Sequence, residues 1–274
     1  MALTLNIIGA GHVGRALGRL FAATGSFAVQ DVLTRSEGSA QAATAFIGAG
    51  TALADATALR RADVWMLAVG DDQIAPVCGQ LAGLLQGAVV FHCSGAKSST
   101  ELQGASAAGA LVASVHPVRS FADPARVVQD FAGTFCGVEG DAAALAQLAP
   151  ALGAIGARTV VIDAAAKTVY HAAAVFASNY LVTVVDAALR AYQAAGIPAD
   201  VARELARPLA TETLANVFRL GPEAALSGPI ARGDMQTVAR QQQAIDGWDA
   251  PTGALYAALV DATTALAVRK HAGM

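Results

Sequence analysis

Three glycines near the start of the chain constrain its fold more than any other feature. Gly9, Gly11 and Gly14 have the spacing G-x-G-x-x-G; the apolar run ALTLNII precedes them, and a helical pattern follows from Val13 to Thr24. The first glycine permits a tight turn, the second lets a phosphate approach the backbone, and the third lets the helix pack closely on the strand. The segment therefore predicts a strand–turn–helix unit that binds the pyrophosphate of a dinucleotide at the helix N-terminus.

The rest of the first half alternates short apolar runs with segments of helical spacing. The runs are FAVQDVLT, ADVWMLAV, GAVVFHC, GALVASV and, last, RTVVID. Strands that are regularly separated by helices predict a parallel, doubly wound sheet. We therefore expect an α/β fold whose N-terminal part is a Rossmann domain.

From about residue 165 the pattern is helical to the end. The spacing predicts helices at about 165–195, 198–220, 235–245 and 252–271, with a break at Pro208 in the second. Strands first and helices last indicate two domains. We place a dinucleotide-binding Rossmann domain over residues 1–163 and an all-α domain over residues 164–274.

Composition narrows the range of partners. The chain has 274 residues, of which 55% are hydrophobic and 14% charged, and its net charge is -3. It has no basic cluster of the kind that binds nucleic acid, and three separated cysteines make no metal or redox motif. The N-terminus lacks a basic signal-peptide region, and polar residues interrupt the most apolar stretch, YHAAAVFASNYLVTVVDAAL. We expect a cytoplasmic protein that contacts neither nucleic acid nor membrane and holds no metal.

The end of the second predicted strand indicates which nicotinamide cofactor binds. An NAD site usually has an acidic residue about 20 residues after the glycines, but Thr34 occupies that position in the sequence LTRS. Arg35 can pair with a 2′-phosphate, and Thr34 and Ser36 add hydroxyl donors, which favours NADP. Two alternatives stay open: Asp31 is the acidic residue, or Arg35 is an ordinary solvated charge. The candidate cofactor-binding residues are Gly9, Gly11, His12, Val13, Gly14, Thr34, Arg35, Ser36, Val69 and Asp71.

Five later motifs point to a family. They are AVGDDQI, FHCSGAKSSTEL, SVHPVRSFADP, KTVYHAAAVFASNYL and LSGPIARGD. With them, nearly the whole chain resembles the Rossmann-like proteins that carry a domain of unknown function numbered 2520, described as NADP-dependent oxidoreductases. The wider superfamily includes pyrroline-5-carboxylate reductase, prephenate dehydrogenase and 3-hydroxyisobutyrate dehydrogenase. The resemblance implies that the Rossmann domain holds the nicotinamide and that the helical domain completes the substrate pocket and dimerises.

Ligands of a parallel sheet bind beyond the carboxyl ends of its strands, so residues that directly follow strands are site candidates. Ser94 and Lys97 resemble a stretch of prephenate dehydrogenase in which a serine and a lysine follow the strand. His116 resembles that enzyme's His-Pro histidine, which bonds the reacting hydroxyl, although VRS follows here in place of Met-x-Gly. His116 can exchange the proton that accompanies hydride transfer, or it can simply order the following loop.

The first helix of the second domain carries a further group of candidates. Lys167 and His171 are four residues apart and share a helix face. Relatives of the 3-hydroxyisobutyrate dehydrogenase type have a general-acid lysine and a substrate-binding asparagine at this spacing, so the resemblance makes Lys167 a candidate acid or base. The alternative is a lysine at the domain junction with its head in water. Asn179 and Arg232 are candidate substrate ligands, and Arg232 can instead pair with Asp234.

Together these features predict an NADP-dependent oxidoreductase that transfers hydride to or from a small polar substrate, a hydroxy, keto or imino acid. The candidate catalytic residues are Lys167, His116, His171 and Ser94. One alternative is a prephenate- or pyrroline-5-carboxylate-type dehydrogenase proper, and the other is a regulator that senses NADP(H) without turnover. The consecutive apolar residues 172–176 make their helix apolar on nearly every side, so we expect a homodimer through the C-terminal helices.

Overall fold

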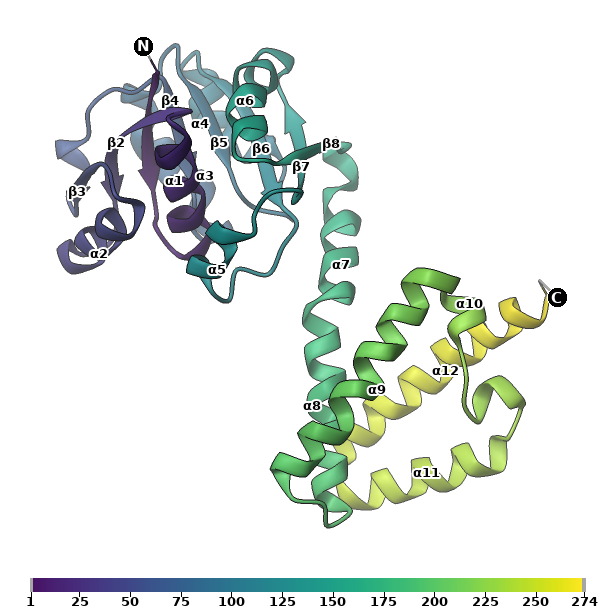
Figure 1. Ribbon diagram of the computed structural model, residues 1–274. Helices are drawn as coiled ribbons and strands as arrows, with labels where there is room; N and C mark the ends of the chain where they lie inside the picture. Colours follow the sequence, from purple (N-terminus) through teal and green to yellow (C-terminus); the bar gives the residue numbers. More distant parts are fainter. Residues whose placement is uncertain (1, 273–274) are drawn as a thin grey trace. The chain divides into compact units, whose positions relative to one another are not determined.

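The structure is a computed structural model that describes residues 2–272. It divides into two compact units, Met1–Phe176 and Ala177–Met274 (Figure 1). The sequence places the domain boundary after residue 163, whereas these units divide inside helix α7 (Lys167–Ala177). The first turn of α7 belongs with the sheet because Lys167 and Tyr170 hydrogen-bond to residues of the first unit.

The first unit is built on an eight-stranded sheet with the order β3-β2-β1-β4-β5-β6-β7-β8. The first six strands in this order form the Rossmann arrangement, with helices on both faces, and confirm the expected fold. All neighbouring strands are parallel except β6 and β7, which are antiparallel. The strands are β1 (Leu3–Ile8), β2 (Phe27–Leu33), β3 (Thr51–Leu53), β4 (Val64–Leu67), β5 (Val89–His92), β6 (Leu111–Pro117), β7 (Phe135–Gly140) and β8 (Arg158–Val161).

Two hydrophobic clusters cover the two faces of this sheet. Leu17 and Phe21 of α1 belong to the cluster on one face, together with residues of α2, α5 and α6. Ile74 and Cys78 of α3 belong to the cluster on the other face, together with Ala105 of α4. The helices of this unit that precede α7 are α1 (His12–Thr24), α2 (Glu37–Ile47), α3 (Ile74–Leu81), α4 (Gln103–Ala107), α5 (Pro124–Gln129) and α6 (Ala142–Ala154).

Several elements of the first unit are absent from the sequence-based prediction. Strand β3 has only three residues, and β7 contains two glycines and a glutamate, so neither forms an apolar run. The all-parallel expectation is therefore wrong at the β6–β7 pair. The spacing of residues 56–61 predicts a short helix, but the structure has only a short 3₁₀ turn there, Ala56–Ala58, which buries none of its own side chains.

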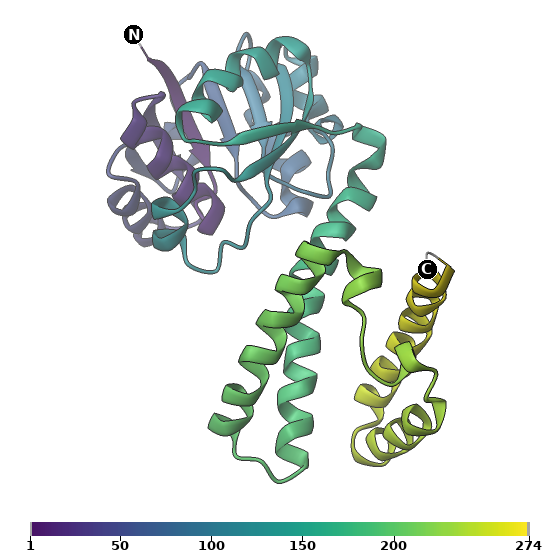
Figure 2. The ribbon, with the colours of Figure 1, turned by 45° about the vertical axis from the view of Figure 1, so that its right-hand side comes forward.

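The second unit consists of two helical hairpins, α8 with α9 and α11 with α12 (Figure 2). The expected helix over 165–195 breaks at Ser178, whose backbone is not helical (φ -128°, ψ -70°); Ser and Asn are weak helix formers at this point. The break expected at Pro208 does not occur, because α9 continues through it. The helices are α8 (Asn179–Ala194), α9 (Ala199–Leu220), α10 (Pro222–Ala225), α11 (Met235–Trp248) and α12 (Ala250–Ala272).

The second unit buries little of its apolar surface. Of its described residues, the apolar ones that are fully buried are Ala202, Val238 and Ala267. Two helical stretches of the chain, Ala164–Ala194 and Ala250–Ala272, are long and apolar enough to cross a membrane if length and composition alone are considered. The membrane-free expectation from the sequence stays a prediction.

Candidate functional site

The glycine turn between β1 and α1 has the backbone that its spacing predicts. Gly9 has φ +82°, and a Cβ there would lie 2.7 Å from the carbonyl oxygen of Ala68. A Cβ at Gly14 would lie 2.6 Å from the Gly9 oxygen, so α1 packs as closely as only glycine allows. Gly11 precedes the first helical residue, and a Cβ there would meet nothing within 4 Å. The turn therefore presents open backbone at a helix N-terminus that has no acidic residue in its first turn, which suits a pyrophosphate.

The other candidates in this turn lie around the glycines. His12 is the exposed first residue of α1, and Val13 is half-buried against the core. Val69 covers Gly9, because a Cβ on Gly9 would lie 2.7 Å from Val69 Cγ1. Asp71 is the exposed first residue of a 3₁₀ turn, Asp71–Gln73, that follows β4. All four lie at or just beyond the carboxyl ends of β1 and β4, where the sheet reverses its strand order.

The end of β2 distinguishes the two readings of the nucleotide site. Asp31 is 1% exposed, and its carboxylate accepts hydrogen bonds from the backbone N–H of Arg60 at 2.9 Å and from the Arg60 guanidinium. A carboxylate occupied in this way is not available to a ribose. Arg35 is exposed just after the strand, and Ser36 caps α2 by accepting from the N–H of Ser39. The structure thus excludes Asp31 and leaves Arg35 free of ion pairs within the described chain.

The loop after β5 is held in place by buried polar side chains. The N–H of Ser94 donates to His92 Nδ1 at 3.2 Å, which leaves His92 Nε2 to donate to the Ser98 carbonyl at 3.0 Å. Ser94 Oγ accepts from the N–H groups of Ala96 and Lys97. His92 and Ser94 therefore shape the loop, and the Lys97 ammonium pairs with Glu101 at 3.1 Å.

Lys167 lies beneath this loop and is 2% exposed. Its Nζ donates to the Ser94 carbonyl at 3.0 Å and to Ser114 Oγ, and it lies 3.7 Å from a carboxylate oxygen of Glu139. Burial lowers the pKa of Lys167, and the Glu139 charge opposes that shift. Because all three N–H directions face protein partners, this placement fits a residue that positions the loop. It does not fit the expected acid or base that reaches substrate, nor a lysine with its head in water.

His116 lies on β6 beyond the last paired residue of β5 and faces two side chains of α7. Its Nδ1 hydrogen-bonds the hydroxyl of Tyr170 at 2.9 Å, and its ring centroid lies 5.6 Å from that of His171. A Cβ on Gly95 would lie 2.3 Å from His171 Nδ1 and 2.8 Å from His116 Nε2, so both imidazole edges meet over this glycine. We call Gly95, His116, Tyr170 and His171 the imidazole cluster.

The environment of the imidazole cluster keeps His116 neutral at physiological pH. Burial, and after it the neighbouring His171 and the charge of Lys167, lower the pKa of His116 to about 4, whereas Asp71 has a smaller, opposite effect. Burial also raises the pKa of Tyr170. A neutral imidazole carries one N–H and one acceptor nitrogen, so the tautomer of His116 depends on whether the Tyr170 hydroxyl donates or accepts.

The two expected substrate ligands of the helical part belong to the second unit. Asn179 is the exposed first residue of α8, and Arg232 is exposed in a 3₁₀ turn, Ile230–Arg232. Arg232 makes no ion pair among the described residues, because Asp234 instead caps α11 through the N–H of Thr237. The roles of Asn179 and Arg232 in substrate binding stay predictions.

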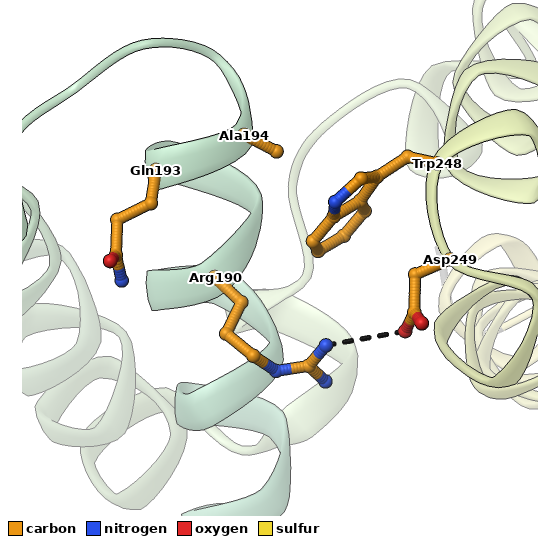
Figure 3. Close-up of a pocket in the computed structure, with 5 residues that line it drawn as sticks. All are labelled: Arg190, Gln193, Ala194, Trp248 and Asp249. Atoms are coloured by element: carbon orange, nitrogen blue, oxygen red, sulfur yellow. Dashed lines mark hydrogen bonds and ion pairs between the residues drawn. The ribbon is translucent and has the colours of Figure 1, made fainter.

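Arg190 lines a small pocket in the second unit, and its N–H donors already bind protein partners (Figure 3). Arg190 pairs with Asp186 at 2.9 Å and Asp249 at 3.2 Å, donates to Thr252, and lies 5.7 Å from the ring centroid of Trp248. These contacts tie α8 to the junction of α11 and α12. The pocket is therefore explained by the packing of the hairpins.

The structure brings three further residues to the site, of which sequence reasoning missed Glu139 and Gly95 and left Tyr170 undecided. Glu139 accepts from the N–H and the hydroxyl of Ser99, both at 2.7 Å, and faces Lys167. Gly95 lies within the quoted motif FHCSGAKSSTEL, but only the close approach of two rings shows why it must be glycine. Tyr170 lies three residues after Lys167, and residues at this helical spacing share a face. This spacing is the sequence signal that indicates a position near the site.

Family models match most of the chain in two segments. A Rossmann-like domain matches residues 1–117, and a domain of unknown function, DUF2520, matches residues 134–263. The chain therefore contains a Rossmann-like domain followed by a DUF2520 domain. No curated protein matches it.

Solved structures share the fold of this DUF2520 protein over nearly its whole length. The Bacteroides fragilis protein BF3122, called a "putative NADP oxidoreductase", is 22% identical, with a TM-score of 0.78 and coverage of 96% of this chain and 98% of that one. Protein TM1727 of Thermotoga maritima is 28% identical, with a TM-score of 0.74 and coverage of 97% and 99%. An imine reductase of Myxococcus stipitatus, solved in complex with NADP+, is 18% identical, with a TM-score of 0.66 and coverage of 98% and 93%.

Proposed function

We propose that this DUF2520 protein is an NADP-dependent oxidoreductase that transfers hydride to or from a small polar substrate. The observation that carries the proposal is a pair of features at one edge of a single sheet. A glycine turn with open backbone follows β1, and a cluster of proton-exchanging side chains from β6 and α7 lies beside the loop that follows β5. Ligands of a doubly wound sheet bind at this edge. The names of BF3122 and of the imine reductase complex agree with a nicotinamide cofactor.

The residues present fit NADP better than NAD. Gly9, Gly11 and Gly14 leave room for the pyrophosphate, and Arg35 with Ser36 offers a cation and a hydroxyl at the end of β2. Asp31, the one carboxylate considered for a ribose, is already bonded by Arg60. A guanidinium that can grip a phosphate through two N–H groups is the usual partner of the 2′-phosphate.

The chemistry expected at the site divides between cofactor and protein. NADPH, when bound, supplies the hydride. The protein supplies the accompanying proton, and His116 is the group suited to it, because it lies at the strand end and hydrogen-bonds a second proton carrier, Tyr170, at 2.9 Å. Lys167 holds the Ser94 carbonyl and so keeps the loop against the cluster.

Replacing Arg35 with alanine tests the cofactor assignment. Losing a hydrogen bond to a charged group costs about 1.5–3 kcal/mol, so NADPH affinity should fall roughly tenfold or more while NADH affinity stays nearly unchanged. Isothermal titration of both nucleotides measures this, with the exposed Arg126→Ala on α5 as the matched control. Equal affinities of the parent protein for NADPH and NADH would contradict the proposal.

The two alternative functions, a dehydrogenase of known type and an NADP(H) sensor, predict different turnover by the purified protein. A prephenate- or pyrroline-5-carboxylate-type dehydrogenase would turn over those substrates. A sensor of NADP(H) would bind the nucleotide with no hydride transfer across a broad panel. The proton-exchanging pair of His116 and Tyr170 favours an enzyme, because a sensor needs no proton donor.

We also propose that the chain forms a homodimer through its C-terminal helices. Val182, Leu209, Phe218 and Val268 are 69%, 60%, 86% and 63% exposed, and they lie on three different helices of a unit that buries few apolar side chains. A domain of this size can bury only a small hydrophobic core. A second copy of the chain would bury these exposed side chains. Sedimentation velocity at micromolar concentration should give about twice the mass of 27.5 kDa. A monomer at that concentration would contradict the dimer.

A further inference from the structure

The imidazole cluster contains polar atoms that lack partners within the protein. His171 Nδ1 is buried, and no described residue hydrogen-bonds it. His116 uses Nδ1 for Tyr170, and no hydrogen bond to its Nε2 occurs in the described chain. The two nitrogens lie close together over Gly95, because a Cβ added to that glycine would lie 2.3 Å from His171 Nδ1 and 2.8 Å from His116 Nε2. An unpaired buried polar atom usually marks the place of a water or a ligand; His171 Nδ1 is such an atom, and His116 Nε2 lies beside it over Gly95.

The charges around the cluster restrict what that ligand can be. Among the described residues, no carboxylate hydrogen-bonds or ion-pairs with His116, Tyr170 or His171. Glu139, the carboxylate buried nearby, is already bonded to Ser99 and faces Lys167. The charges of Lys167 and Asp71 both reach His116, and that of Lys167 is the stronger. A cationic ligand would therefore lose its hydration here without a matched counter-charge.

On the basis of the proposed oxidoreductase function, we propose that His116 and His171 together bind the oxygen of a carbonyl–alcohol pair, so that the substrate is a ketone, an aldehyde or an alcohol and not an imine or amine. A carbonyl oxygen accepts two N–H donors, and it gains negative charge when hydride reaches its carbon. A protonated imine nitrogen has no lone pair and carries the positive charge that this site does not balance.

The proton balance assigns a role to Tyr170. The Tyr170 hydroxyl donates to His116 Nδ1, which leaves the single ring proton of the neutral imidazole on Nε2, facing the substrate oxygen. When hydride from NADPH reaches the carbonyl carbon, the C=O π pair moves to oxygen and takes the Nε2 proton. His116 Nδ1 then takes the Tyr170 proton, and water reprotonates the phenolate. The alkoxide is a stronger base than the phenolate, so the transfer runs in this direction. In its Nδ1–H form, His171 donates a second hydrogen bond to the same oxygen.

Matched substrates test the class directly. NADPH oxidation is compared for cyclopentanone against 2-methyl-1-pyrroline, and for 2-oxopentanoate against 1-pyrroline-2-carboxylate. We expect kcat/KM for the ketone to exceed that for the imine by roughly 10²-fold in at least one pair. His171→Ala should lower the ketone value by roughly 10²-fold, because removing one oxyanion donor costs about this much, while His271→Gln on α12 leaves it unchanged.

A second measurement does not depend on turnover. In the full chain loaded with NADP+, ¹⁵N NMR of the five histidines, assigned by single His→Gln variants, reports tautomer and charge. We expect His116 to be neutral at pH 7 with its proton on Nε2, to lose that preference in Tyr170→Phe, and to titrate near its lowered pKa of about 4. Cyclopentanol should shift the His116 and His171 signals, and pyrrolidine at the same concentration should not.

The two proposals fail in different ways. A protein that binds no NADPH contradicts the oxidoreductase. A protein that binds NADPH and reduces the imines faster than the ketones contradicts only the carbonyl class. An imidazolium at His116 at pH 7, or signals that move with pyrrolidine and not with cyclopentanol, also overturns the carbonyl class. If neither compound of a pair is turned over, the NMR comparison alone gives the answer.

Discussion

Replacing His116 with glutamine is expected to lower turnover by roughly 10²–10⁴-fold, which is the usual contribution of a positioned proton donor. Glutamine keeps a polar side chain on β6, but it cannot pass a proton from one nitrogen to another. The bond between His116 Nδ1 and the Tyr170 hydroxyl, at 2.9 Å, makes the imidazole the middle member of a relay. The effect should therefore appear in kcat, on whichever compound of the panel the parent enzyme turns over.

The same substitution should leave NADPH affinity close to that of the parent. His116 lies on β6, whereas the glycine turn follows β1 and Arg35 follows β2, two strands that lie on the far side of β4 and β5 in the sheet. Titration of NADPH into His116→Gln separates a lost proton donor from a damaged cofactor site. Turnover within threefold of the parent would remove His116 from the chemistry and would leave it the role of ordering the loop.

Tyr170→Phe distinguishes a relay from an isolated histidine. Phenylalanine keeps the ring and removes only the hydroxyl, which is the proton source. The ring lies against Gly137, because a Cβ added to that glycine would lie 2.4 Å from the Tyr170 hydroxyl. We expect a loss smaller than that of His116→Gln, because Nε2 of the remaining imidazole can still donate. A loss equal to or greater than that of His116→Gln would mean that Tyr170 contacts the substrate itself.

Local sequence features predicted the cofactor edge of the site better than the catalytic edge. The G-x-G-x-x-G spacing encodes a backbone geometry, and Gly9 and Gly14 show it because a Cβ on either would clash. The cationic Arg35, in the stretch where an NAD site has an acidic residue, can also be read from a few neighbouring residues. The sequence could not show whether the Asp31 carboxylate is free to bind a ribose. Its partner Arg60 lies 29 residues away and follows a short turn with no strong sequence pattern.

The catalytic edge depends on contacts between distant segments. Lys167 reaches the Ser94 carbonyl across 73 residues, and Glu139 reaches Ser99 across 40. Glu139 lies on β7, the antiparallel strand that the alternating pattern does not reveal, so its side chain could not be assigned to the site in advance. The sequence marked Lys167 as important for its residue type. Its burial and its three partners determine that it positions the loop.

Removing Glu139 should produce the largest loss of stability, because it leaves the Lys167 ammonium buried without its counter-charge. Lys167 is 2% exposed and Glu139 5%, and breaking such a pair by deleting one partner costs about 3–5 kcal/mol. We expect Glu139→Leu to lower the free energy of unfolding of the first unit by this amount. Lys167→Met should cost less, since the remaining carboxylate keeps two hydrogen bonds from Ser99 at 2.7 Å.

The sequence offers a specific reporter for this measurement. Its two tryptophans lie in different units: Trp65 is fully buried on β4, and Trp248 ends α11 in the second unit. In a Trp248→Phe background, Trp65 fluorescence during urea unfolding of the full chain follows the first unit alone. The double variant Glu139→Leu with Lys167→Met should recover part of the loss, because an apolar pair of similar size leaves no buried charge.

The pH dependence of the stability of Glu139→Leu tests whether the stranded charge of Lys167 causes the loss. Burial already lowers the pKa of Lys167 below its usual 10.5, and removing the Glu139 charge lowers that pKa further. Between the folded pKa and 10.5 the unfolded chain holds more protons than the folded one, so the stability of the variant rises with pH across that window. The deficit of Glu139→Leu relative to the parent should therefore be smaller at pH 9 than at pH 7. A deficit that stays constant with pH would mean that lost packing, and not a stranded charge, destabilises the variant.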